Sequence, residues 1–133
     1  MKLRFVAPAL AAASLLAASP AQSQTQIQWW HAMSGPLGEW VADLAKDFNA
    51  KQKDVVVVPT YKGTYGETLT AGIAAFRAGN APDILQVYEV GTATMMASKG
   101  AIKPVAEVMT TGGAKFDPKV YIPAVAGYYT APN

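Results

Sequence analysis

The sequence predicts an α/β fold with a mainly parallel sheet flanked by helices. Three short runs of apolar or β-branched residues alternate with segments that have helical periodicity. Short apolar runs bounded by turn-forming residues are typical of strands that are buried on both faces. Strand–helix–strand spacing favours right-handed crossovers and therefore a parallel sheet. The predicted strands are Ile27–Trp30, Val55–Val58 and Ile84–Tyr88.

Residues 1–23 are predicted to be a secretory signal peptide that lies outside the fold. Two basic residues precede an Ala- and Leu-rich run over residues 5–18. Small residues follow, and we expect cleavage after Ala21 or Ser23. The run is too short to cross a hydrocarbon core of about 30 Å. Residues 24–133 then form one partial α/β domain.

Charge and cysteine content exclude several classes of protein. Beyond the signal peptide the chain has nine basic and nine acidic residues, so it lacks the basic face of a nucleic-acid-binding protein. The sequence has no cysteine and a single histidine, His31. It therefore offers no thiol for a lipid anchor, and it supports neither a metal site nor a cofactor.

Two amphipathic helices are predicted between the strands. Within residues 36–52, apolar side chains recur at the spacing of one helical face. They are Leu37, Trp40, Val41, Leu44, Ala45 and Phe48. Ser34 is the expected N-cap of this helix. The second helix covers residues 65–78 and ends at a Gly-Asn pair. Gly72 within it is expected to let a neighbouring backbone approach closely.

After the third strand the pattern predicts shorter elements. Helical turns are expected over residues 92–99 and 106–111, and a last helix over residues 117–126. Residues 102–105 and 127–129 are expected to be extended.

In open α/β sheets, ligands bind beyond the carboxyl ends of the strands. The corresponding loops are residues 31–35, 60–66 and 89–92. Their candidate side chains are His31, Ser34, Tyr61, Lys62, Thr64, Tyr65 and Glu89. Glu89 directly follows the third apolar run, which makes it the strongest pointer to a ligand site. A helix-capping or solvated role for Glu89 is an equally open interpretation.

Known catalytic arrangements are poorly matched. A hydrolase with two carboxylates would have to use Glu67 and Glu89, yet Glu67 suits the first turn of a helix better. A packed role is expected for His31, Trp29–Trp30 and Met95–Met96. The remaining chemistry is recognition, because a carboxylate accepts hydrogen bonds from two hydroxyls and tyrosines add hydroxyl groups and aromatic walls. A small hydroxylated ligand fits this set.

Two short motifs stand near the start of the predicted mature chain, Trp30-His31-x-Met33 and Phe48-Asn49-Ala50. They resemble the start of proteins in family 1 of the extracellular solute-binding proteins of ABC importers. The stretches 58–63, 71–77 and 79–96 resemble, more specifically, the glycerol-3-phosphate-binding members of the family.

This resemblance implies part of the N-terminal lobe of a longer, two-lobed, type II-like binding protein, so that the chain is an N-terminal fragment. It implies a non-enzymatic periplasmic protein that delivers sn-glycerol-3-phosphate and glycerophosphodiesters, such as glycerophosphocholine, to a membrane permease. It also implies that Tyr65 and Glu89 hydrogen-bond the glycerol hydroxyls. Two other functions remain open, a sugar- or oligosaccharide-binding protein of the same fold and a secreted hydrolase using Glu89.

Overall fold

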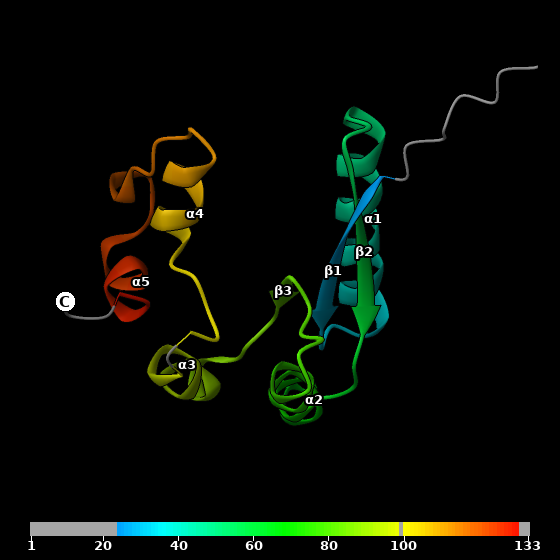
Figure 1. Ribbon diagram of the computed structural model, residues 1–133, viewed down its shortest axis with the longest axis horizontal. Coiled ribbons are helices and arrows are strands. Elements are labelled where there is room, and N and C mark those ends of the chain that lie inside the picture. The colour runs from blue at the N-terminus through cyan, green and yellow to red at the C-terminus, as the bar shows by residue number, and fades with distance from the viewer. Residues whose placement is uncertain (1–23, 99, 131–133) are drawn as a thin grey trace, which may run out of the picture.

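A three-stranded parallel sheet forms the centre of the first half of the protein, which confirms the predicted fold class. The computed structural model describes residues 24–98 and 100–130, so the predicted signal peptide lies outside the described residues. The strands are β1 (Thr25–His31), β2 (Val55–Tyr61) and β3 (Ile84–Leu85). They lie in the order β2-β1-β3, with β1 in the middle (Figure 1).

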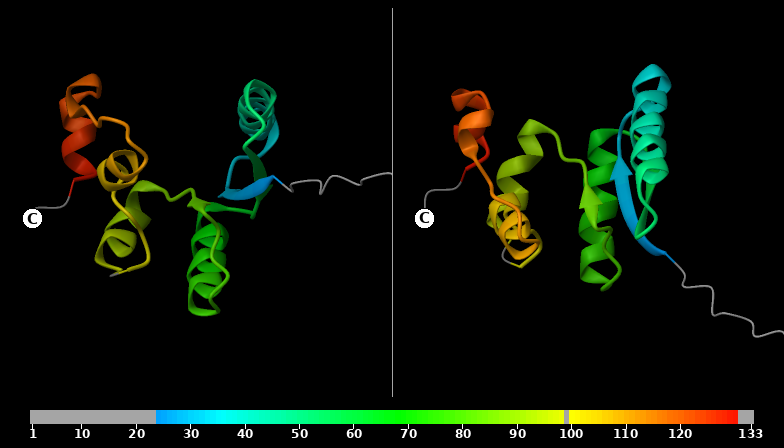
Figure 2. Two further views of the ribbon diagram at one scale, coloured as in Figure 1. Left: turned by 45° about the horizontal axis from the view of Figure 1, so that its top comes forward. Right: turned by 90° about the horizontal axis from the view of Figure 1, so that it is seen from above.

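Helices α1 (Gly35–Lys51) and α2 (Tyr65–Arg77) lie on opposite faces of this sheet (Figure 2). The chain moves from β1 to β2 in one direction and from β2 across β1 to β3 in the other. Because parallel crossovers are right-handed, this reversal puts the two helices on opposite faces. The strand order thus accounts for the layered arrangement.

The packed core is small. The almost fully buried apolar side chains are Val41, Ala45 and Ala75, at 2%, 4% and 8% exposure. The other four members of the predicted α1 face remain more than 40% exposed, namely Leu37, Trp40, Leu44 and Phe48. A face about 100° wide needs a broad partner, whereas this sheet has three strands, one of two residues. Only the centre of the predicted face is therefore buried.

The outer edge of β2 is covered by a side chain of α1. Asn49 donates from Nδ2 to the carbonyl of Val57 at 2.9 Å, and its Oδ1 accepts from the Val57 amide at 2.8 Å. An unpaired strand edge is open to pairing with other chains. The Asn49 amide thus replaces a neighbouring strand at this point.

Side chains also extend the pairing of the short strand β3 with β1. Asp83 accepts from the amide of Gln28 at 2.8 Å, and the Gln86 side chain accepts from the amide of Ala32 at 2.9 Å. The predicted strand over residues 84–88 is thus shorter in the structure. On either side of β3, a side-chain oxygen accepts a hydrogen bond from a backbone amide of β1 or of the residue after it, in place of a strand carbonyl.

Gly72 is the contact point of α2 with β3. A Cβ atom at this position would lie 2.5 Å from Cδ2 of Leu85. Glycine lets the two elements approach closely, as predicted, but the neighbour is a side chain and not a backbone.

The second half of the chain is helical and lies apart from the sheet (Figure 1). It contains α3 (Glu89–Ala97), α4 (Val105–Thr111), the 3₁₀ turn η1 (Pro118–Val120) and α5 (Pro123–Tyr128). The single predicted last helix is divided, because Pro123 keeps Ile122 extended and starts a new helix. The prediction that residues 127–129 are extended was wrong, since α5 continues to Tyr128. Among the helices in residues 24–98 and 100–130, none combines the length and apolarity needed to cross a bilayer.

Candidate functional site

The three strands end at one edge of the sheet, where the predicted ligand-facing loops lie. His31, the last residue of β1, is paired in register with Tyr61, the last residue of β2. The Gln86 amide bonds to the carbonyl of Trp30 at 2.9 Å just beyond β3. Parallel pairing therefore brings the ends of all three strands together, as the sequence predicted.

His31 is packed within this edge. It is 5% exposed, and its ring lies 6.0 Å from the Trp29 ring and 6.1 Å from the Tyr61 ring. Burial lowers the pKa of His31, and a hydrogen bond with the Met33 backbone opposes this effect. A buried, mainly neutral imidazole between two aromatic rings supports the packing interpretation.

Lys62 is directed at an aromatic ring. Its Nζ lies 3.8 Å from the centroid of the Trp30 ring, a cation–π geometry. Its backbone amide also donates to the carbonyl of His31 at 2.9 Å. Lys62 thus joins the end of β1 to the loop that follows β2.

Thr64 and Glu67 form a capping box at the start of α2. The Glu67 carboxylate accepts from the Thr64 amide at 2.7 Å and from its hydroxyl at 2.9 Å. The Thr64 hydroxyl in turn accepts from the Glu67 amide at 3.3 Å. The bond from the Thr64 backbone, and then the one from its hydroxyl, lowers the pKa of Glu67. Glu67 thus caps α2, which leaves a two-carboxylate hydrolase without its second acid.

The structure places Tyr65 and Glu89 at the starts of α2 and α3. The Tyr65 ring lies 5.5 Å from the ring of Tyr88, which immediately precedes Glu89. The two predicted ligand contacts thus lie on neighbouring segments at the same edge of the sheet. Glu89 was expected in a loop, but it is the first residue of α3.

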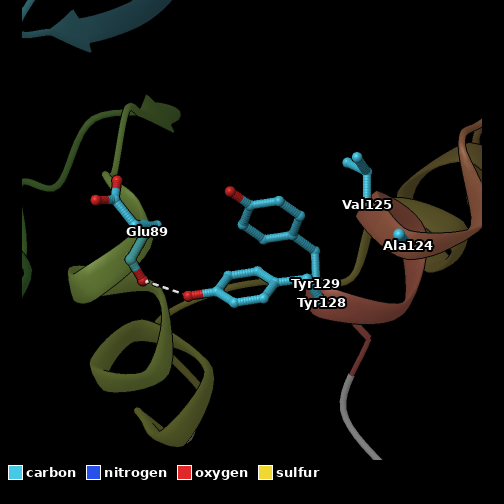
Figure 3. A pocket seen from close by; sticks show the side chains of 5 residues that line it. All are labelled: Glu89, Ala124, Val125, Tyr128 and Tyr129. Atoms are coloured by element: carbon cyan, nitrogen blue, oxygen red, sulfur yellow. Dashed lines mark hydrogen bonds between the residues drawn. The ribbon is translucent and has the colours of Figure 1, made fainter.

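Glu89 also lines an open pocket between α3 and α5 (Figure 3). The cavity has a volume of about 410 Å³, and its other lining residues are Ala124, Val125, Tyr128 and Tyr129. The Tyr128 hydroxyl donates to the backbone carbonyl of Glu89 at 3.1 Å. A carboxylate beside apolar and phenolic side chains gives this pocket one charged acceptor and otherwise uncharged walls.

The two pocket tyrosines were not predicted as site residues. Tyr128 and Tyr129 were expected in an extended segment without a role, and they lie 39 and 40 positions after Glu89 in the sequence. Adjacent aromatic residues after a proline-started helical turn are the only local signal for them. Nothing in that signal specifies which distant residue they approach.

In residues 24–98 and 100–130, no group of three His, Cys, Asp or Glu side chains is arranged to hold a metal ion. The polar groups described above are hydrogen-bond donors and acceptors.

Comparison with known families and proteins gives a consistent result. Residues 19–132 match the family model of the bacterial extracellular solute-binding proteins. Over 128 residues the chain is 58% identical to the sn-glycerol-3-phosphate-binding periplasmic protein UgpB of Escherichia coli O1:K1 / APEC. It is 59% identical over 124 residues to the protein of that name from Pectobacterium atrosepticum, and 56% identical over 128 residues to that of Escherichia coli K12.

These alignments cover most of this chain but a small part of the relatives. They include 96%, 93% and 96% of this chain, and 29%, 28% and 29% of the respective relatives. The chain thus spans less than a third of the length of the curated relatives that it matches.

Proposed function

Because the chain belongs to the family of bacterial extracellular solute-binding proteins, we propose that it acts in the substrate-binding subunit of an ABC importer for sn-glycerol-3-phosphate. The observation that carries this proposal is the identity of 56–59% to relatives named for binding that compound. Those relatives are named periplasmic, which fits the predicted signal peptide and supports a periplasmic location. Members of this family bind solutes and do not catalyse reactions.

In this proposal Glu89 and Tyr65 bind the glycerol end of the ligand. The Glu89 carboxylate has lone pairs for two ligand hydroxyls, and it lines an open pocket where a ligand can reach it. Tyr65 is 42% exposed, so its hydroxyl and ring are also accessible. The contact of Tyr65 with Tyr88 supports a shared role, since it holds the first residues of α2 and α3 near each other.

Substitution of Glu89 by glutamine tests the site. Glu89→Gln keeps the size of the side chain and its contact through the backbone carbonyl, but it removes the charge. Hydrogen bonds to a charged group contribute about 1.5–3 kcal/mol each. We therefore expect the affinity for sn-glycerol-3-phosphate, measured by isothermal titration calorimetry, to fall at least about tenfold.

Glu107→Gln is the matched control. Glu107 lies in the first turn of α4, is exposed, and does not line the Glu89 pocket. This variant should bind like the unaltered protein. Equal affinities of the two variants would reject Glu89 as a ligand contact.

The remaining parts of the proposal concern the ligand range and the partner. We propose that glycerophosphodiesters such as glycerophosphocholine are also bound, and that the ligand is delivered to membrane permease subunits. Titration of the diesters beside sn-glycerol-3-phosphate and a neutral disaccharide would rank these ligands. Hydrolysis of a glycerophosphodiester by the purified protein, at either of its two ester bonds to phosphorus, would instead contradict the proposal.

A further inference from the structure

Two consecutive tyrosines line the α5 side of the Glu89 pocket, and they differ in what their hydroxyls do. Their rings meet edge to face, with centroids 4.9 Å apart and planes at 76°. The Tyr128 hydroxyl donates a hydrogen bond to the Glu89 backbone carbonyl at 3.1 Å. The bond ties the end of α5 to the start of α3 and fixes one ring as a support for the other.

The Tyr129 hydroxyl has no such partner. Within the part of the chain that the structure describes, no hydrogen bond to it is formed, and the side chain is 53% exposed. Figure 3 shows the Tyr129 ring reaching from α5 toward α3, with its hydroxyl pointing toward Glu89. The pocket thus has an accessible phenol on its α5 side and an exposed acidic residue on its α3 side.

We propose that Tyr129 is a ligand-contacting residue, which hydrogen-bonds one hydroxyl of a vicinal diol while the Glu89 carboxylate accepts from the diol. This inference rests on the proposed function and adds a contact that the sequence did not predict. An ionised carboxylate can only accept hydrogen bonds, whereas a phenol donates as well as accepts. The pair therefore satisfies a diol better than either group alone.

The rest of the pocket suits the carbon side of the same ligand. Ala124 and Val125 add apolar surface next to the tyrosine rings. A small polyol has hydroxyls on one side and C–H groups on the other, and sites for such ligands combine mostly apolar walls with a few placed polar groups. In this pocket Glu89 and Tyr129 supply the polar groups, and Ala124 and Val125 supply apolar surface.

Tyr129→Phe tests the inference because it removes the hydroxyl and leaves the ring. A neutral hydrogen bond contributes less than one to a charged group, so we expect the dissociation constant for sn-glycerol-3-phosphate to rise about three- to tenfold. Tyr121→Phe is the matched control. Tyr121 is 50% exposed, stacks on Phe116 at 5.9 Å and does not line the pocket, so its loss of a hydroxyl should leave binding unchanged.

Two ligand analogues identify the contact more sharply. Propane-1,2-diol phosphate and propane-1,3-diol phosphate each lack one of the two hydroxyls of the natural ligand. If Tyr129 bonds one hydroxyl, the Tyr129→Phe effect should disappear for the analogue that lacks it and remain for the other. This is a double-mutant cycle in which one change is made in the ligand. An equal effect on all three compounds would indicate a structural role and overturn the inference.

The Glu89→Gln variant separates failure of this inference from failure of the proposed function. If Glu89→Gln weakens binding and Tyr129→Phe does not, the inference on Tyr129 is wrong and the proposed function stands. If the unaltered protein does not bind sn-glycerol-3-phosphate, both are wrong. Parallel loss in both variants, with Tyr121→Phe unchanged, supports both.

Discussion

At the scale of single residues, we expect one buried group and one capping group to make the stability of the protein depend on pH. His31 is the single histidine of the chain and lies among aromatic rings. Burial lowers its pKa below the ordinary value of 6.5. The folded protein therefore binds fewer protons than the unfolded chain between the folded pKa and about pH 6.5.

We expect the free energy of unfolding to decrease as the pH falls through 6.5, since the unfolded chain then gains the proton first. Urea unfolding at pH 7.5 and 5.5 measures the change. His31→Gln should be less dependent on pH over this range, because no other side chain has an ordinary pKa there. A decrease of the same size in His31→Gln would contradict the assignment.

Glu67 is expected to affect the free energy of unfolding at acidic pH, below the range in which His31 does. Its pKa is lowered from 4.5 by the Thr64 hydrogen bonds, so its stabilising effect is present above about pH 4.5 and is lost as the pH falls through the folded pKa. Between pH 5 and 3, the unaltered protein should lose more stability than Glu67→Gln, which keeps an acceptor but cannot be protonated in this way. Circular dichroism during urea unfolding gives both values. Thr64→Ala should reduce the difference between them.

The place of Glu67 in the first turn of α2 and the place of Glu89 directly after the third strand could be predicted from the sequence, whereas the approach of Tyr129 to the Glu89 pocket could not. Thr64 and Glu67 are three positions apart, and a local spacing specifies their contact. Glu89 was identified because it directly follows an apolar run. Tyr129 meets the same pocket across 40 positions of sequence. Only the path of the chain through α4 and η1 brings it there.

At the scale of elements, the contact of α2 with β3 depends on a residue without a side chain. We expect Gly72→Ala to destabilise the protein, because the new Cβ would lie 2.5 Å from Leu85. The strain of overpacking is about 1–3 kcal/mol and exceeds the gain of about 1 kcal/mol in helix propensity. Urea unfolding measures the net loss.

Gly66→Ala is the control for this prediction. Gly66 lies in the same helix, and a Cβ there would meet no atom within 4 Å. The substitution should be neutral or stabilising by up to about 1 kcal/mol. Similar effects of both substitutions would show that the close approach of Leu85 does not limit position 72.

The helices were predicted more reliably than the extent of their burial. Helical periodicity identified α1 and the six apolar residues on one of its faces, yet only Val41 and Ala45 are buried. Periodicity reports which side chains share a face, but the width of the opposing sheet decides how many are covered. The strand β3 was also predicted too long, because an apolar run does not show where backbone pairing stops. The side chains of Asp83 and Gln86, rather than backbone carbonyls, accept the hydrogen bonds next to its two ends.

At the scale of the whole molecule, one hydrogen bond holds the end of the helical second half of the chain to its start, next to the sheet edge. The Tyr128 hydroxyl and the Glu89 carbonyl join α5 to α3 across 39 positions. Parallel order could be predicted, because strand–helix spacing and right-handed crossovers leave few alternatives. The placement of α3, α4 and α5 could not, because short helices with weak apolar faces leave their packing partners open.

The Asn49 amide has a consequence for how the sheet can grow. On the β2 side, the Val57 backbone groups are already bonded to a side chain, so an incoming strand would first have to displace it. No comparable block is present on the outer side of β3 within the described residues. The two edges of the sheet therefore differ in how easily another strand could pair with them. A strand added to the sheet would meet bonded backbone groups at β2 and none bonded in this way at β3, the strand that leads into Glu89.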